Sequence, residues 1–344
     1  MTLPVFVDVD TGVDDAMALV YLFGSDDADV VAIASTAGNV PVQQVCRNNL
    51  GLLKLCGVDI PVSKGSEQPI SAPLRTAEDT HGPEGIGYAR LPATDRKLTT
   101  YDAAEAWALA AQAYPGELIG VATGPLTNLT LALRREPALP TLLRRLVIMG
   151  GAFDYRGNTT PVAEWNISVD PEAAAEVFAA WGSAWGSSAP THLPIVLGLN
   201  LTENIAMTPA LLNRLATTAE SSSIPMSVLD DRGTRSVASN PLIAVLEDAM
   251  RFYFEFHFDQ DEGYLAHLHD PLAAAVALDP DLVMCRPTTI DVELTGTLTR
   301  GMTIADWSNR WGREPNALIG VGVDPKAFFD RFIARVGAFA RRLS

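Results

Sequence analysis

Five short runs of apolar, largely β-branched residues constrain the fold more strongly than any other feature of the sequence. A polar residue or a glycine closes each run, and the runs occupy residues 5–9, 30–35, 118–122, 146–149 and 195–199. Continuously apolar strands belong to a parallel sheet whose two faces are both covered by helices. Helical patterns lie between them, at residues 15–23, 42–56, 102–114, 126–134 and 171–181. The alternation predicts an α/β fold with an open, mostly parallel sheet flanked by helices.

Later parts of the chain do not continue this alternation of strands and helices. Residues 208–268 are expected to be mainly helix and loop, and we interpret them as a helical insertion near a pocket. Residues 288–294 have the pattern of a strand, and residues 325–342 that of a closing amphipathic helix. Because no repeat, low-complexity tract or linker interrupts the sequence, we expect residues 1–344 to form a single domain.

The charge balance excludes several classes of partner. The chain has 25 Lys and Arg residues against 41 Asp and Glu residues, a formal net charge of −16. A field of that sign repels nucleic acid and anionic membranes, and suits a neutral small molecule or a cation. The three cysteines have no metal-type spacing, and the first residues lack the basic start of a signal peptide. We therefore expect a cytoplasmic protein that binds neither nucleic acid nor membrane.

Polar side chains gather where the predicted strands end. They are Asp8 and Asp10, Asn39, Thr123, the Met149–Gly150 pair, and Asn200. In open α/β sheets, ligands bind outside the carboxyl ends of the strands. These exits therefore predict one common site.

Four carboxylates fall within eight residues at the first of these exits: Asp8, Asp10, Asp14 and Asp15. Asp8 and Asp10 are two apart, so an extended backbone places them on the same face. Asp14 and Asp15 also suit the N-terminus of the following helix, but that role leaves Asp8 and Asp10 unexplained. Such mutual repulsion calls for a cation, and oxygen ligands of this kind favour Ca²⁺ or Mg²⁺.

The same stretch resembles the Asp-x-Asp-x-x-x-Asp-Asp signature of the nucleoside hydrolases, the inosine–uridine-type N-ribohydrolases. Further family blocks follow in order over most of the chain. They are Gly38-Asn39, the His-Gly-x-x-Gly-x-Gly loop at residues 81–87, Thr-Gly-Pro-Leu-Thr-Asn at residues 123–128, Met-Gly-Gly at residues 149–151, residues 158–166 and Leu-His-Asp-Pro at residues 268–271. The resemblance implies hydrolysis of the N-glycosidic bond of a ribonucleoside to ribose and free base.

The resemblance also implies a metal site. It places a Ca²⁺ ion on Asp10, Asp15, the carbonyl oxygen of Thr123, and Asp270. Asp10 would then take a proton from a water bound to the ion. Taken alone, Asp270 before Pro271 reads as an ordinary helix N-cap, so the implied ligand would also cap a helix.

A third implication concerns the sugar. The family pattern places one set of polar groups around the ribose hydroxyls: Asp14, Asn39, the backbone N–H of Met149, Asn158, Glu164 and Asn166. Glu164 and Asn166 are two apart, which puts both on one face if the segment is extended. Asn158 on its own resembles a turn residue beside Gly157.

Histidines are the candidates at the nucleobase, because their unperturbed pKa of about 6.5 suits proton donation near neutral pH. We expect His269 to donate the proton to the departing base and His81 to contact the base. His192, His257 and His267 are interpreted as packing residues. Residues 252–258 are rich in aromatic side chains at helical spacing, so most should lie in the core, with one ring, Tyr253 or Tyr264, facing the pocket.

Two other functions compete with this interpretation. A haloacid-dehalogenase-type phosphatase would use Asp8 as nucleophile and Asp10 as acid, but its mechanism needs a positioned lysine and the chain has four lysines in no recognisable block. A nucleoside-binding protein without turnover would keep the pocket and lose Asp10 or a metal ligand.

The sequence departs from the family pattern at two places. Glu84 stands where Asp is frequent, and Trp165 where Phe is common. These departures leave a preference for purine or pyrimidine nucleosides open. The resemblance further suggests a homodimer or homotetramer.

Overall fold

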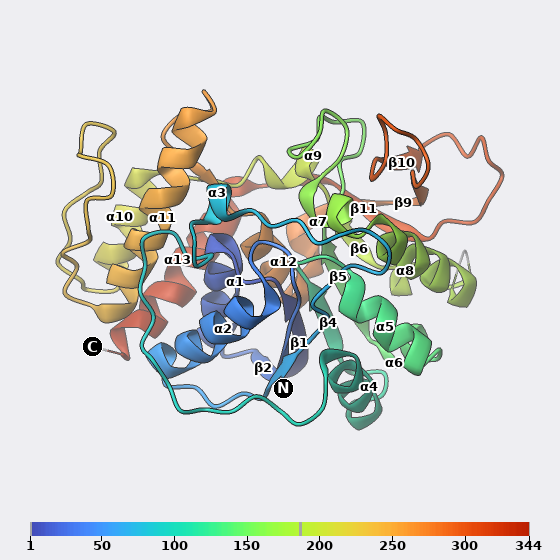
Figure 1. The fold of residues 1–344 in the computed structure, drawn as a ribbon, viewed down its shortest axis with the longest axis horizontal. Coiled ribbons are helices and arrows are strands. Elements are labelled where there is room, and N and C mark those ends of the chain that lie inside the picture. Colours follow the sequence, from blue (N-terminus) through green and yellow to red (C-terminus); the bar gives the residue numbers. More distant parts are fainter. Residues whose placement is uncertain (1, 186–187, 344) are drawn as a thin grey trace.

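A computed structural model describes residues 2–185 and 188–343 of the chain (Figure 1). Its centre is a nine-stranded sheet in the order β10-β9-β11-β6-β5-β4-β1-β2-β3. The strands are β1 (Leu3–Val9), β2 (Ala28–Ser35), β3 (Val62–Lys64), β4 (Ile119–Ala122), β5 (Arg145–Met149), β6 (Ile195–Leu197), β9 (Val283–Val292), β10 (Thr303–Asp306) and β11 (Ala317–Val323). Neighbouring strands are parallel from β3 to β11, and β9 runs antiparallel to β11 and β10.

The five predicted strands are the contiguous centre of this sheet, β6-β5-β4-β1-β2, so the α/β prediction is confirmed. Strand β6 ends two residues earlier than expected, because Leu199 opens a short helix. Strand β9 begins at Val283, ahead of the predicted residue 288. The edge strands β3 and β10 were not predicted, because strands of three and four residues give too short a pattern. The interior strand β11 was also missed, although its residues are all apolar or glycine.

Helices cover both faces of the sheet (Figure 1). The longer ones are α1 (Val13–Phe23), α2 (Val42–Cys56), α4 (Ala103–Ala113), α5 (Thr127–Arg135), α8 (Pro171–Ala184), α10 (Pro209–Thr218), α11 (Pro241–Asp259), α12 (His269–Leu278) and α13 (Pro325–Arg341). The short ones are α3 (Glu78–His81), α6 (Leu139–Leu142), α7 (Trp165–Val169), α9 (Leu199–Thr202) and the 3-10 turns Pro190–His192 and Pro280–Leu282.

Two hydrophobic cores lie on opposite faces of the sheet. In β1, Val5, Val7 and Val9 join the core that contains α1, α11, α12 and α13. Phe6 points the other way and packs on Trp107 of α4, with ring centroids 4.1 Å apart. The period-2 alternation of a strand thus distributes a continuous apolar run between two helical layers.

Helix α12 is buried along its whole length and packs against α1 and β5. Hydrophobic burial of this Ala-rich segment brings its N-terminus to the carboxyl end of β1 and β5. A residue near position 270 is thereby placed beside residues 10–15.

The insertion at residues 208–268 contains α10 and α11, as predicted, joined by an irregular segment at residues 219–240. It ends in β8 (Ala266–His267), which pairs antiparallel with β7 (Ala206–Met207). This small ribbon anchors the insertion beside the start of α12. In the described part of the chain, no helix has the length and apolarity needed to cross a membrane.

Candidate active site

The floor of the site is a cluster of buried carboxylates from two distant parts of the chain. Asp14 and Asp15 open helix α1, and Asp270 lies at the start of α12. One carboxylate oxygen from each lies within 4.8 Å of the others. Asp10, just past the end of β1, is fully buried next to them. The packing of α12 on α1 therefore assembles the group.

Asp10 is held through one of its two oxygens. Its Oδ2 accepts a hydrogen bond of 2.8 Å from the backbone N–H of Asn39. Its Oδ1 is buried and has no hydrogen-bond partner among the described residues, and the same is true of Oδ1 of Asn39. Buried polar oxygens without partners are rare, and two together fit a site that takes a cation or a bound ligand.

Asp15 combines two roles that the sequence left as alternatives. Its Oδ2 accepts from the backbone N–H of Gly12 at 2.8 Å, which caps the N-terminus of α1. Its Oδ1 accepts from Thr123 Oγ1 at 2.7 Å, which ties α1 to the end of β4. The same carboxylate thus stabilises the helix and belongs to the acidic cluster.

Electrostatics in this cluster oppose ionisation. Burial, and the neighbouring carboxylates after it, raise the pKa of Asp14 to about 7 and that of Asp10 well above the usual range. The pKa of Asp270 is raised well above its usual range for the same reasons. A divalent cation would offset this repulsion, and an all-oxygen donor set of this kind fits a hard ion.

Two local predictions about these acids were wrong. Helix α12 begins at His269 and Leu268 is its cap, so Asp270 is the second helical residue and caps nothing. Asp8 does not join the cluster: its Oδ2 accepts from Trp107 Nε1 at 2.8 Å and its Oδ1 from Asn128 Nδ2 at 2.9 Å. Strand β1 ends at Val9, so the alternation that placed Asp8 and Asp10 on one face does not extend to Asp10.

A cavity of about 500 Å³ opens above the acidic floor. All the residues predicted to surround the ribose contribute to its lining, namely Asp14, Asn39, Met149, Asn158, Glu164 and Asn166. Thr123, His81, His269 and Asp270 line it as well, whereas Asp10 and Asp15 are fully buried behind this lining. Asn200 turns elsewhere, since its Nδ2 donates to the carbonyl of Gly320 in β11 at 3.2 Å.

Glu164 and Asn166 line the cavity, but their backbone conformation differs from the extended one that was predicted. The segment is helical, and Glu164 is the N-cap of α7. Its carboxylate accepts from the backbone N–H groups of Asn166 and Ile167, at 2.8 and 3.0 Å, and from that of Gly151 at 3.0 Å. Asn166 Nδ2 donates to the Thr123 carbonyl at 2.6 Å, so the two residues are rigidly placed.

Asn158 sits in the loop between β5 and α7, as a turn residue would. Its Oδ1 accepts from the backbone N–H of Trp165 at 2.9 Å, while the residue itself remains exposed at the cavity wall. Trp165 also lines the cavity, with the guanidinium of Arg75 5.7 Å from its ring centroid. Glu84, the other departure from the family pattern, is exposed and its carbonyl accepts from Asn48.

His81 lies at the end of α3, and a hydrogen bond determines which of its ring nitrogens carries the proton. Its Nδ1 accepts a 3.1 Å hydrogen bond from the backbone N–H of Val13, the first residue of α1. Burial, and after it the neighbouring His257, lowers the pKa of His81 to about 3. The neutral ring therefore carries its proton on Nε2 and can serve as a hydrogen-bond donor.

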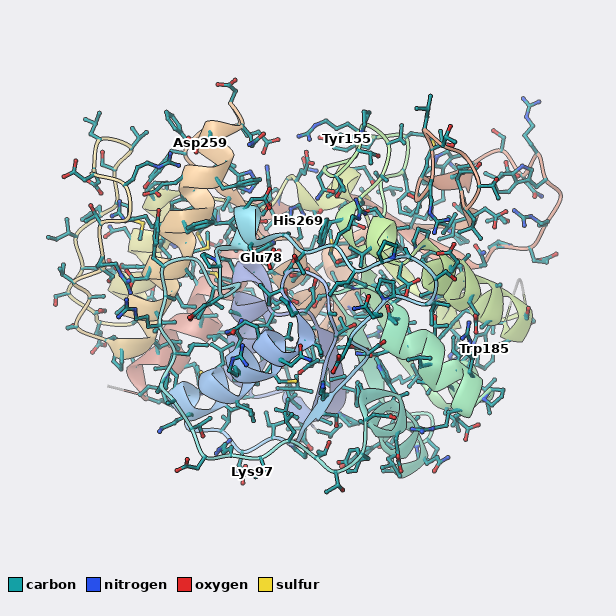
Figure 2. The ribbon with its side chains drawn as sticks, viewed as in Figure 1. Glu78, Lys97, Tyr155, Trp185, Asp259 and His269 are labelled. Carbon is teal, nitrogen blue, oxygen red and sulfur yellow. The ribbon has the colours of Figure 1, made fainter. Side chains whose placement is uncertain are left out.

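His269 is buried at the start of α12, and Figure 2 shows it between the end of α11, at Asp259, and the loop that carries Tyr155. Its Nδ1 is 2.7 Å from the hydroxyl oxygen of Thr202. Burial and the neighbouring imidazoles lower the pKa of His269 well below its usual value.

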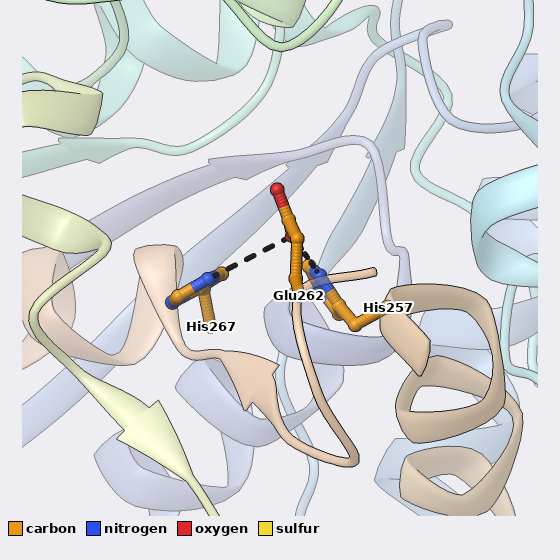
Figure 3. Close-up of side chains that lie close together, drawn as sticks. All are labelled: His257, Glu262 and His267. Carbon is orange, nitrogen blue, oxygen red and sulfur yellow. Dashed lines mark hydrogen bonds and ion pairs between the residues drawn. The ribbon is translucent and has the colours of Figure 1, made fainter. Parts of the chain in front are cut away.

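Two histidines that the sequence analysis interpreted as packing residues line another part of the cavity. His257 and His267 both line it, together with Glu262 between them (Figure 3). Of the two rings expected to face the pocket, Tyr253 lines it, whereas Tyr264 packs on Phe254. Tyr253 and His257 are four apart on α11, and this i, i+4 spacing was the available signal for a shared face.

Comparisons with known proteins agree with one another. Residues 5–330 match the family described as inosine-uridine preferring nucleoside hydrolase. A pyrimidine-specific ribonucleoside hydrolase of Citrobacter koseri is 35% identical over 343 residues, 99% of this chain and 100% of that protein. A purine-preferring ribonucleoside hydrolase from Gardnerella vaginalis has a TM-score of 0.85 at 29% identity, covering 98% of this chain and 99% of the other. A plant nucleoside hydrolase has the same TM-score at 30% identity, covering 98% and 100%.

Proposed function

The chain belongs to the inosine-uridine preferring nucleoside hydrolase family and hydrolyses the N-glycosidic bond of ribonucleosides, and we propose that Asp10 is its general base beside a bound Ca²⁺ ion. The observation that carries this proposal is the unpartnered, buried Oδ1 of Asp10. Asp10 lies behind the cavity wall, next to Asp14 and Asp270, which do line the cavity. Its other oxygen is already held by Asn39, so Oδ1 is the one available to a water molecule.

The proposed Ca²⁺ ligands are Asp10, Asp15, Asp270 and the carbonyl oxygen of Thr123. All four residues are buried, and Asn166 Nδ2 already fixes the orientation of that carbonyl. When bound, the ion supplies a lowered pKa for a coordinated water and an anchor for two cis hydroxyls of the ribose.

The ribose would lie against Asp14, Asn39, Met149, Asn158, Glu164 and Asn166. Departure of the base leaves positive charge on the sugar, and the carboxylates of Asp14 and Glu164 stabilise that charge from fixed positions. Glu164 is oriented by three backbone N–H groups, so no reorganisation is needed as the charge develops. Asp10 accepts the proton of the water that attacks the sugar carbon.

The nucleobase would occupy the other end of the cavity, beside His81 and His269. The neutral His81 donates through Nε2, and His269 is held in orientation by Thr202. Because the Citrobacter koseri relative is pyrimidine-specific, we propose uridine and cytidine as the preferred substrates. We further propose a cytoplasmic homodimer or homotetramer that acts in nucleoside salvage.

The phosphatase alternative has no support in the structure. Its nucleophile would be Asp8, whose two oxygens are both hydrogen-bonded, to Trp107 and Asn128. A buried carboxylate engaged in this way is not available to attack phosphorus.

The test is release of reducing sugar from uridine, cytidine, inosine, adenosine and guanosine, without added phosphate. We expect ribose from the pyrimidine nucleosides at the highest kcat/KM. Faster release from inosine or guanosine would contradict the pyrimidine preference, and no release from any of the five would contradict the proposed activity.

The metal is tested separately by binding. Calorimetric titration of chelator-treated protein with Ca²⁺ should give one site per chain, and Asp270→Asn should weaken it. Unchanged Ca²⁺ affinity in that variant would remove Asp270 from the ligand set.

A further inference from the structure

The cavity wall carries a second group of metal-ligating side chains, distinct from the carboxylates of the acidic floor. It consists of His257 on α11, Glu262 in the loop after that helix, and His267 on β8 (Figure 3). One ring nitrogen of each histidine and one carboxylate oxygen lie within 4.8 Å of one another. All three residues line the cavity, and neither the proposed Ca²⁺ site nor the proposed ribose contacts use them.

The distances within this group are close to those around a small divalent ion. Glu262 Oε2 is 2.7 Å from His257 Nδ1 and 4.0 Å from His267 Nε2. Two ligands of a tetrahedral ion, each bonded at about 2.0–2.1 Å, lie about 3.3–3.4 Å apart. The two observed distances fall on either side of this value, so a movement of the Glu262 carboxylate by less than about 1 Å would bring both nitrogens to a common centre.

The backbone positions the three side chains without help from an ion. The N–H of Glu262 donates to the carbonyl oxygen of His257 at 3.1 Å, which folds the loop back over the last turn of α11. Gly263 follows with φ +98°, a left-handed conformation in which the chain turns toward β8. His267 pairs with Ala206 in the small antiparallel ribbon. Ligands that are already in place lose little conformational freedom on binding.

The surrounding charges favour a cation. Arg156 is 3.2 Å from Glu262 Oε1 and 2.8 Å from Glu203 Oε2. Two carboxylates against one guanidinium leave one net negative charge beside the two imidazoles. Because Arg156 takes Oε1 of Glu262, the other oxygen is the one directed at the histidines.

We propose that His257, Glu262 and His267 bind a divalent transition-metal ion of the Zn²⁺ class. Two imidazole nitrogens and one carboxylate oxygen are a donor set that such ions prefer, whereas Ca²⁺ takes oxygen ligands. Three protein ligands leave the fourth position of a tetrahedral ion open to the cavity that all three residues line. The ion would replace the proton between His257 Nδ1 and Glu262 Oε2, and the neutral ring would then carry its proton on Nε2.

An ion at this position would regulate the proposed reaction. The His267 ring centroid is 5.7 Å from that of His269, one of the two histidines proposed to contact the base. A metal ion with its bound water therefore competes with the nucleobase for the same part of the cavity. This consequence rests on the proposed function, whereas the metal site itself does not.

The site is tested with Co²⁺, whose visible absorption is stronger in a tetrahedral site than in a six-coordinate one. The protein is titrated in excess Ca²⁺, so that the acidic floor is not the available site. We expect one Co²⁺ per chain with a tetrahedral spectrum, and added Zn²⁺ should abolish that spectrum by displacement.

The variants identify the ligands. His257→Gln and His267→Gln should each weaken Co²⁺ binding by at least about 10²-fold, since loss of an outer-shell partner alone costs about 10–100-fold. His192→Gln is the matched control, because that ring stacks on Trp185 in another part of the chain, and it should bind Co²⁺ like the wild-type protein. Far-UV circular dichroism checks that each variant is folded.

The regulatory consequence is tested with uridine in excess Ca²⁺. At a Zn²⁺ concentration ten times its Kd, competition should raise the apparent KM for uridine by about tenfold and leave kcat unchanged. In His267→Gln, the same Zn²⁺ concentration should leave the KM of that variant unchanged.

Two results would overturn the metal site. One is the absence of a tetrahedral Co²⁺ spectrum in the wild-type protein. The other is a spectrum that persists in both histidine variants, which would place the ion elsewhere. Zn²⁺ binding without any change in KM would overturn the regulatory role. Failure of the proposed function is distinct, because the wild-type protein would then release no ribose while the Co²⁺ titration still decides the site.

Discussion

The two ends of the cavity are built by different means. At the end where we propose that the sugar binds, buried carboxylates and amides project from strand ends and helix starts, and backbone N–H groups fix Asp10, Asp15 and Glu164. At the other end, where we propose that the base binds, the side chains come from α11 and loops, and the Arg156 side chain that pairs with Glu203 and Glu262 is half-exposed. The first end is thus fixed by the backbone of the sheet and its helices, whereas the second depends on contacts between side chains.

The largest expected effect separates Asp10 from Asp8, two residues away. Asp10→Asn removes the proposed general base, so kcat on uridine should fall by about 10⁴-fold. Asp8→Asn changes a carboxylate whose two oxygens are already hydrogen-bonded to Trp107 and Asn128, and it should keep kcat per folded molecule within about tenfold. Steady-state ribose release from both variants measures the difference, and equal losses would mean that the two acids act together.

Removing one sugar hydroxyl probes the rigid end further. Since the donors and acceptors there are fixed, 2′-deoxyuridine leaves a charged or polar partner unmatched. A cost of about 3 kcal/mol corresponds to about a 10²-fold loss in kcat/KM relative to uridine. Comparable kcat/KM values for the two nucleosides would show that the protein makes no productive contact with the 2′-hydroxyl.

Asp8 supports the rigid end from behind, and its effect should appear in stability. Asp8→Asn places an amide N–H against the donors Trp107 Nε1 or Asn128 Nδ2, at a cost of about 1–3 kcal/mol in unfolding free energy. Urea denaturation of the two proteins measures this difference. An Asp8→Asn variant as stable as the wild-type protein would contradict this role.

The pH dependence of that difference has a defined sign. Burial raises the pKa of Asp8 to about 6, above its unfolded value of about 3.9. Between these two pH values the folded state binds a proton at Asp8 that the unfolded state does not. This proton stabilises the folded state, and the stabilisation is lost as pH rises through 6. The stability gap between wild type and Asp8→Asn should be larger at pH 4.5 than at pH 7.5.

The smallest effect is expected at the base end. The Arg156 side chain is 51% exposed while it pairs with Glu203 and Glu262. Exposed ion pairs contribute up to about 1 kcal/mol, so Arg156→Ala should raise KM for uridine by about fivefold at most and leave kcat close to wild type. Arg134→Ala breaks a pair with Glu176 that is similarly exposed, at 48%, and serves as the matched control. A KM increase in both variants would signal a general effect.

The sequence by itself determined the central sheet and the reaction. The five apolar runs could only be buried in a parallel sheet, and the carboxylate signature with its ordered blocks indicated the family. The resemblance also pointed to six residues for the ribose, and all six line the cavity.

Tertiary structure decided which of these residues do what. Asp8 and Asp10 look equivalent in sequence, but the end of β1 at Val9 separates them. Glu164 became a helix cap, and Asp270 reached the floor only because α12 is buried against α1. The pairing of His257 with Glu262 depends on how a loop returns to α11, and no local periodicity encodes a contact of that kind.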